Sequence, residues 1–190
     1  LHYVDHELGR LIEALDAAGL SERTVLIVSS DHGEAFGEHG ARFHASTLYD
    51  ELLRVPLFIA MPGIAPRRVG ESVSLIDLGP TILDIFGQPT PGHFLGESLL
   101  GFVHGSAPRL TRPILAEGRL KRAWVFPDGY KLVTDGLTGT LELYDLNKDP
   151  AELENVFEVE PTANSRLAAL EAFFDIHRIR RPGYQIPLRR

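Results

Sequence analysis

The chain has 190 residues, of which 44% are hydrophobic and 24% are charged, a usage typical of a globular protein that excludes a disordered or fibrous one. The formal net charge of −7 argues against binding to a phosphate backbone, so we expect no nucleic-acid partner. The absence of Cys excludes disulfides, thiolate metal ligands and a cysteine nucleophile within these residues. Apolar runs such as Val55 to Met61 are far shorter than the roughly 20 residues of a membrane span, so we expect no such span.

The first part of the chain alternates between helical and strand-like patterns. Apolar residues recur at helical spacing up to Leu15, and Gly19 follows at the place of a left-handed cap, which predicts a helix over residues 1–18. The runs at 24–29 and 55–60 are typical of strands that are buried on both faces of a parallel sheet. The other elements expected here are a polar loop at 30–45, a helix at about 46–54, and a helix N-capped by Asp77 that stops at Gly87.

The second part of the chain has the pattern of an antiparallel sheet. Residues 87–108 are rich in Gly and Pro and are expected to form a connector. A closing helix over 164–177 has apolar residues on one side and is expected to cover one face of the sheet. The predicted strands, separated by turn signals at 127–129 and 135–136, lie at 113–117, 123–126, 130–134 and 140–146.

Asp31 and His32 stand side by side directly after the first apolar run. Ligands of open α/β sheets bind beyond the carboxyl ends of the strands, and the following Gly33 lets both side chains turn toward one ion. Carboxylate oxygen and neutral imidazole nitrogen together suit a divalent cation, but a closed site needs further donors. The alternative, from position alone, is a strand-end turn that binds nothing.

The same loop continues with more polar side chains. Glu34 and Glu38 could orient the histidines, or they could simply be solvated. His39 and His44 could act on a ligand, or they could be ordinary loop histidines that are hydrogen-bonded to the backbone. The residues alone leave these alternatives open.

Several segments follow one another in the order of a known family. The first two, SDHGEAFGEHG and FHASTLYDELLRVPLFIAMPG, resemble the C-terminal half of the catalytic domain of sulfatases, which are members of the alkaline phosphatase superfamily. The family's next segment resembles VSLIDLGPTILDIFG with GESLLGFVHG, and its C-terminal subdomain resembles GYKLV with LELYDLNKDPAELENV. The resemblance implies a partial alkaline-phosphatase-like α/β sandwich over 1–108, followed by a small α+β subdomain over 109–190 with an antiparallel sheet and a C-terminal helix.

The resemblance also implies roles for three residues. It makes Asp31 and His32 two ligands of a divalent cation, which is expected to be Ca²⁺. Because many arylsulfatases have Asn where this chain has His32, Mn²⁺, Mg²⁺ and Zn²⁺ are alternatives. Many sulfatases place a sulfate-contacting Lys twelve residues further on, where this chain has His44. A histidine can contact an anion or donate a proton to a leaving oxygen, so His44 is the candidate catalytic residue.

The other half of such a site is not found in these residues. In the family, the remaining carboxylate ligands and a formylglycine made within a C/S-x-P-x-R motif come earlier in the domain. This chain begins with Leu1 and has no such motif, so we expect part of a longer sulfuric ester hydrolase that is inactive alone. The expected substrate is a small-molecule or glycan sulfate ester. The alternatives are a phosphonate monoester hydrolase or phosphodiesterase of the same superfamily, and a non-catalytic protein that retains the fold.

Overall fold

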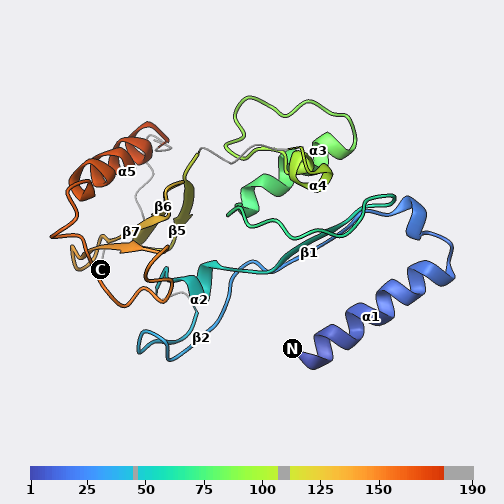
Figure 1. The fold of residues 1–190 in the computed structure, drawn as a ribbon, viewed down its shortest axis with the longest axis horizontal. Coiled ribbons are helices and arrows are strands. Elements are labelled where there is room, and N and C mark those ends of the chain that lie inside the picture. The colour runs from blue at the N-terminus through green and yellow to red at the C-terminus, as the bar shows by residue number, and fades with distance from the viewer. Residues whose placement is uncertain (45–46, 107–111, 178–190) are drawn as a thin grey trace, which may run out of the picture. The chain divides into compact units, whose positions relative to one another are not determined.

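A computed structural model describes residues 1–44, 47–106 and 112–177 of the chain. The chain divides into two compact units, Leu1–Ile114 (unit 1) and Leu115–Arg190 (unit 2), and Figure 1 labels most of their elements. Both units combine helices with small sheets, as expected for an α/β protein. None of the described helices is long and apolar enough to cross a membrane.

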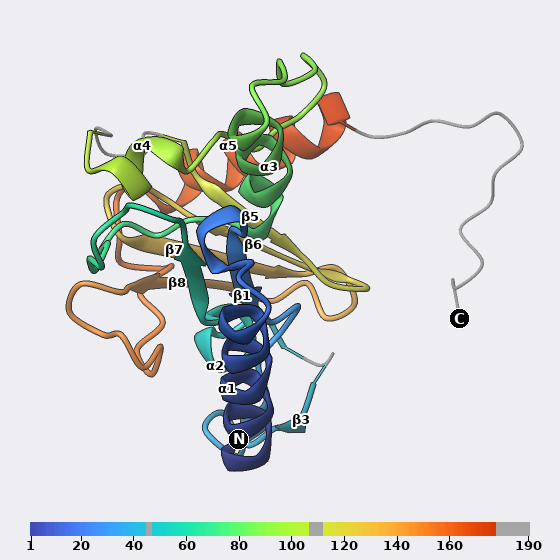
Figure 2. The same ribbon diagram turned by 90° about the vertical axis from the view of Figure 1, so that its right-hand side faces the viewer.

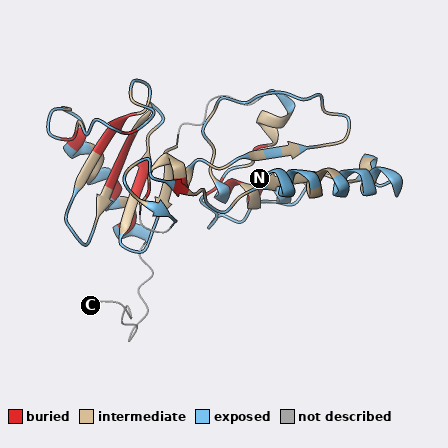
Figure 3. Cartoon of the chain, turned by 90° about the horizontal axis from the view of Figure 1, so that it is seen from below, coloured by how far each residue is buried: buried red, intermediate tan, exposed pale blue. Residues whose placement is uncertain are grey.

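Unit 1 opens with α1 (His2–Ala17), a straight helix that confirms the prediction from apolar spacing (Figure 2). A single 3₁₀ turn, η1 (Ser21–Arg23), follows it. No residue of α1 is buried, and Val4 and Leu11 on its apolar stripe are 67% and 50% exposed (Figure 3). The described residues therefore leave the apolar stripe of this helix uncovered.

The two apolar runs form the strands β1 (Leu26–Ser29) and β4 (Leu57–Ala60), but they pair differently from the prediction. The pair is antiparallel, with Leu26 opposite Ala60, and neither strand contains a buried residue. Parallel neighbours need a long crossover, which is usually a helix, to carry the chain back to the same end of the sheet. Here the helix between the strands, α2 (Asp50–Leu53), has four residues, which is too short for that role.

The chain between β1 and β4 also contains a small hairpin that the sequence did not predict. It consists of β2 (Ala35–Phe36) and β3 (Arg42–Phe43), in antiparallel register. The helix expected over about 46–54 is confined to α2, and residues 45–46 lie outside the described part. Leu52 on α2 is buried and anchors this helix in unit 1.

Asp77 corrects the prediction of a simple N-cap. It ends the 3₁₀ turn η2 (Leu75–Asp77) and precedes α3 (Leu78–Ile85), but its carboxylate makes no capping bond to α3. The fully buried carboxylate instead accepts hydrogen bonds from the Ser74 N–H at 2.8 Å and the Glu97 N–H at 2.9 Å. It also pairs with the guanidinium of Arg112. Asp77 thus joins three separate segments of unit 1.

Thr81 on α3 makes a similar connection to the segment that follows. Its buried hydroxyl donates to the Asp77 carbonyl at 2.6 Å and accepts from the Leu99 N–H at 2.9 Å. The chain then enters α4 (Leu100–His104), a short helix within the stretch that was expected to be a connector. These hydrogen bonds satisfy buried polar groups of both elements. The segment that contains α4 is therefore an integral part of the fold and not a loose connector.

Unit 2 confirms the predicted meander. Its sheet has the order β5-β6-β7-β8, and the pairs β6·β7 and β7·β8 are antiparallel. The closing helix α5 (Ala163–His177) follows, also as predicted. The strand bounds are Ile114–Glu117 for β5, Lys121–Val125 for β6, Tyr130–Asp135 for β7 and Leu141–Asp145 for β8.

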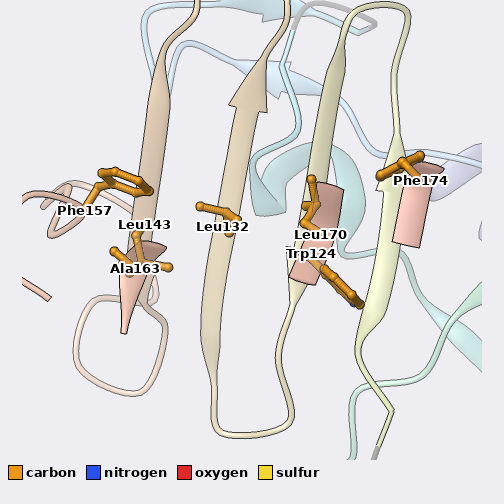
Figure 4. Close-up of a cluster of buried hydrophobic side chains, with 7 residues drawn as sticks. All are labelled: Trp124, Leu132, Leu143, Phe157, Ala163, Leu170 and Phe174. Atoms are coloured by element: carbon orange, nitrogen blue, oxygen red, sulfur yellow. The ribbon is translucent and has the colours of Figure 1, made fainter. Parts of the chain in front are cut away.

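The core of unit 2 lies between this sheet and α5. Leu132 and Leu143, which are fully buried and opposite each other on β7 and β8, pack with Trp124 and with Leu170 and Phe174 of the helix (Figure 4). Burial of each leucine contributes about 1.5–3 kcal/mol relative to an exposed side chain. The helix therefore covers one face of the sheet, as its apolar side indicated.

Polar burial marks the other face of the same sheet. Lys131 stands next to Leu132 on β7, so its side chain points to the opposite side of the sheet. Its Nζ lies 2.7 Å from Oε1 of Glu152, and both side chains are almost fully buried. Glu152 belongs to the Asp-Pro-x-Glu turn after β8 and has a φ of 55°. The GYKLV and Asp-Pro-x-Glu segments are thus joined by a buried ion pair that connects strand and turn.

Candidate functional site

The candidate site is the loop that leaves β1 and returns to α2. Gly33 attaches this loop to α2, because its N–H donates to the Leu52 carbonyl at 2.8 Å. A Cβ at this position would lie 2.0 Å from the Glu51 carbonyl oxygen, so no side chain fits. The close approach of the two backbones therefore requires a glycine directly after His32.

Asp31 and His32 lie at the exposed start of the loop. The His32 backbone N–H donates to Asp31 Oδ1 at 3.1 Å, and the His32 ring Nδ1 lies 2.7 Å from the Gly33 carbonyl oxygen. A carbonyl can only accept, so Nδ1 carries the proton and the neutral ring keeps its lone pair on Nε2. This Nε2 lies 3.9 Å from Oδ2 of Asp31, an arrangement in which both atoms can approach one ion.

His44 returns to the same place from the far end of the loop. Its ring stacks on the ring of His32, with the centroids 4.6 Å apart and the planes inclined by 26°. Its Nδ1 lies 3.7 Å from Oε2 of Glu34, and the His44 side chain is 54% exposed. The structure thus brings together the three residues singled out from the sequence and adds the carboxylate of Glu34 to them.

Glu34 has one carboxylate oxygen that lacks a partner. Its Oε1 is buried and has no hydrogen-bond partner among the described residues. A buried acceptor without a donor is unfavourable, so this oxygen marks a place where a donor from outside the described residues would be stabilising.

The ligand atoms of Asp31 and His32 determine whether a cation could bind at the start of the loop. Asp31 and His32 supply one oxygen and one nitrogen, which are ligand types that divalent cations accept. Across residues 1–44, 47–106 and 112–177, no group of three or more His, Asp or Glu side chains is arranged to hold a metal ion. Asp31 and His32 therefore fit as part of a ligand set, to which other residues must contribute.

His39 and Glu51 form a second interaction in the loop, which the sequence did not reveal. Nδ1 of His39 lies 2.9 Å from Oε1 of Glu51, and the side chains are only 13% and 10% exposed. The ring of His39 also stacks on Tyr49, with the centroids 3.8 Å apart. His39 therefore secures the loop to the segment around α2. Partners so far apart in a loop have no characteristic spacing, so no local signal could have identified them.

Glu38 closes the hairpin of the same loop. Its Oε2 accepts a hydrogen bond from the Phe36 N–H at 2.7 Å. Donation from the backbone N–H groups of Glu38 itself and of Phe36 holds the pKa of this carboxyl below its usual range. The glycines at 37 and 40, both with positive φ, were the available signal for this turn. Glu38 thus has a defined role in shaping the loop.

The mixed α/β fold of this chain is shared with solved proteins of the sulfatase and alkaline-phosphatase-like class. Residues 1–88 match the sulfatase family model. Arylsulfatase K of Bos taurus is 34% identical over 185 residues, which cover 86% of this chain and 33% of that protein. Over most of its length the chain is similar to the C-terminal portion of sulfatases. It spans about a third of the length of this curated relative.

Two solved structures extend the comparison. The phosphonate monoester hydrolase of Agrobacterium radiobacter has a TM-score of 0.74 and 30% identity, covering 91% of this chain and 38% of that chain. A protein solved in complex with its substrate D-Glucosamine-2-N, 6-O-disulfate has a TM-score of 0.71 and 26% identity, covering 91% of this chain and 38% of that chain. The fold is thus shared with one protein named for phosphonate monoesters and with another solved with a sulfated sugar.

Proposed function

We propose that the protein to which these residues belong hydrolyses sulfate esters, and that this part of it supplies Asp31, His32 and His44 to the active site. The observation that carries the proposal is the stacked pair of His32 and His44, 4.6 Å apart, beside the carboxylate of Asp31. These side chains meet at a strand end, where α/β proteins bind their ligands. The match of residues 1–88 to the sulfatase family model supports this assignment.

Asp31 Oδ2 and His32 Nε2 are the proposed ligands of a divalent cation. We propose Ca²⁺, with Mn²⁺, Mg²⁺ and Zn²⁺ as alternatives because imidazole nitrogen suits softer cations. When bound, the cation would offset the charge that develops on the sulfuryl oxygens. The hydrogen bond from Nδ1 of His32 to the Gly33 carbonyl holds the ring in the orientation and tautomer that present Nε2.

His44 is proposed to donate a proton to the leaving oxygen. Its Nδ1 faces Glu34, so its other ring nitrogen, Nε2, is the atom that would reach a substrate. Protonation of the leaving oxygen matters most when the alcohol is a poor leaving group and typically contributes 10²–10⁴-fold to the rate. The relative that was solved with a disulfated glucosamine supports sulfated sugars as a substrate class, and their alcohols are poor leaving groups.

The experiment compares His44→Ala with the wild type in the full-length protein. We expect turnover of a sugar sulfate to fall by about 10²-fold or more, and turnover of 4-nitrophenyl sulfate to fall by less than about tenfold. The exposed His93 lies on a different segment of unit 1, and His93→Ala is the matched control. Equal losses on both substrates would remove the proton-donor role.

A second candidate function is hydrolysis of phosphonate monoesters. It is favoured by the similarity to the phosphonate monoester hydrolase of Agrobacterium radiobacter, which is 30% identical with a TM-score of 0.74. Both esters present a tetrahedral anion, so the same loop could serve either reaction. Turnover of phenyl phosphonate monoesters without turnover of any sulfate ester would favour this second function.

A further inference from the structure

Phe43 has an unusual backbone conformation next to the candidate catalytic residue. Its φ is 70°, in the left-handed region, where a bulky side chain is strained. The same hairpin uses positive φ twice more, at Gly37 with 121° and Gly40 with 71°, and there the residue is a glycine, which adopts the conformation freely. At position 43 the chain therefore carries a phenylalanine where a glycine would be unstrained.

Packing within the described residues does not account for this phenylalanine. The residue is 71% exposed, whereas Ala35, its partner across the hairpin, is buried. A strained residue is expected to persist where another requirement maintains it, and such residues cluster at functional sites. The phenylalanine side chain at position 43 is therefore expected to contact a group that lies outside the described fold.

Phe43 stands next to the candidate catalytic residue. It directly precedes His44, whose ring stacks on His32 beside Asp31. An exposed aromatic ring in this place can lie against the part of a substrate that departs from the proton donor, and such rings stack well on flat apolar faces.

We propose that Phe43 is a specificity-determining residue whose ring contacts the leaving group of the ester. It would favour leaving groups with a flat apolar face, which an aromatic ring and a sugar ring both provide. This inference rests on the proposed hydrolysis of sulfate esters and adds the class of alcohol that the site selects.

The test compares full-length Phe43→Gly with the wild type on 4-nitrophenyl sulfate, glucosamine 6-sulfate and ethyl sulfate. We expect kcat/KM to fall about tenfold on a ring-containing ester and to stay unchanged on ethyl sulfate, which has no ring. A loss on only the aryl ester or only the sugar ester identifies which ring the site selects. The Tm is expected to stay equal or to rise, because glycine removes the backbone strain.

Two further variants separate the ring from the backbone. Phe43→Asn also tolerates the left-handed conformation, so it should reproduce the losses of Phe43→Gly if the ring is what matters. Phe36→Ala is the matched control, because Phe36 is 78% exposed on the same hairpin but stands at the adjacent register position, opposite Arg42. Phe36 lies on β2 and is not adjacent to His44, so Phe36→Ala should leave all three substrates unaffected.

Several outcomes would overturn the inference. No loss, or equal losses on all three esters, would show that the ring does not select the leaving group. A Tm lowered by several degrees in Phe43→Gly would show that the ring packs against another part of the protein. If the wild type hydrolyses none of the sulfate esters, the proposed function fails and this inference with it, whereas turnover without discrimination overturns only the role of Phe43.

Discussion

The imidazole of His32 shows how single contacts prepare a side chain for chemistry. Its Nδ1 is 2.7 Å from the Gly33 carbonyl oxygen, so the lone pair of the neutral ring is on Nε2. His39 differs, because its Nδ1 is engaged by the carboxylate of Glu51 in a mostly buried pair. Two histidines of one loop thus have different roles, which follow from the group that each Nδ1 meets.

Asp135 gives a prediction for pH dependence at the residue scale. The ammonium of Lys121 at 2.9 Å, together with the backbone N–H of Leu137, lowers the pKa of this carboxyl from 3.8 to about 2. Its stabilising contribution is therefore complete above about pH 4 and is lost as the pH falls toward 2. We expect Asp135→Asn to make the decline in the free energy of unfolding between pH 4 and pH 2 shallower.

Urea unfolding of the chain between pH 2 and pH 5 measures this effect. The comparison variant is Lys121→Met, which removes the main cause of the shift and should make the decline smaller, ending it at a higher pH. The same pH slope for Asp135→Asn and the wild type would contradict the assignment.

At the scale of elements, the hairpin and α2 together determine the geometry of the loop. Both β2 and β3 have only two residues, and the hairpin is closed by backbone and carboxylate hydrogen bonds within the loop. The other attachment is the hydrogen bond from Gly33 to Leu52 on α2. The side chains at 31, 32 and 44 are therefore positioned by elements too short to be stable alone.

Gly33→Ala tests this attachment. An added Cβ would lie 2.0 Å from the Glu51 carbonyl oxygen, so the loop must move away from α2 and lose the hydrogen bond to Leu52. We expect the free energy of unfolding to fall by about 1–3 kcal/mol, measured by chemical denaturation of the chain. Gly70→Ala is the control, because no atom lies within 4 Å of its added Cβ, and it should change stability by less than about 0.5 kcal/mol. Equal effects of the two variants would refute the close approach.

At the scale of the whole molecule, burial is distributed unevenly. The buried apolar cluster belongs to unit 2, where α5 covers the sheet, whereas α1 of unit 1 has no buried residue. Resistance to local opening follows burial and cooperative hydrogen bonding. The two units should therefore differ in how readily their backbones open.

Hydrogen exchange on the 190-residue chain measures that difference. We expect the amides of Leu132 and Leu143, in the fully buried pair on β7 and β8, to exchange most slowly. The amides of α1 should exchange early, because tertiary packing does not support this helix within the described residues. Equal protection of α1 and β7 would show that α1 is covered in solution.

The sequence predicted those elements whose evidence is local. Periodicity was sufficient to predict α1, the meander of unit 2 and α5. The apolar pattern of each helix repeats over more than one turn, and that of each strand over more than two positions. The hairpin β2–β3 was missed because strands of two residues leave no period to detect. The antiparallel pairing of β1 and β4 was also missed, because pairing is decided by the path of the intervening chain.

The sequence by itself determined the sulfatase resemblance and the residues that carry the candidate chemistry, since motif order and residue type are properties of the chain. Only the tertiary structure decided which side chains meet: His44 on His32, His39 on Glu51, and the carboxylate of Asp77 on Arg112 rather than on a helix end. These contacts join residues distant in sequence. These residues are brought together by the geometry of the loop, by the close backbone approach at Gly33 and by burial. None of these features leaves a periodic pattern in the amino-acid sequence.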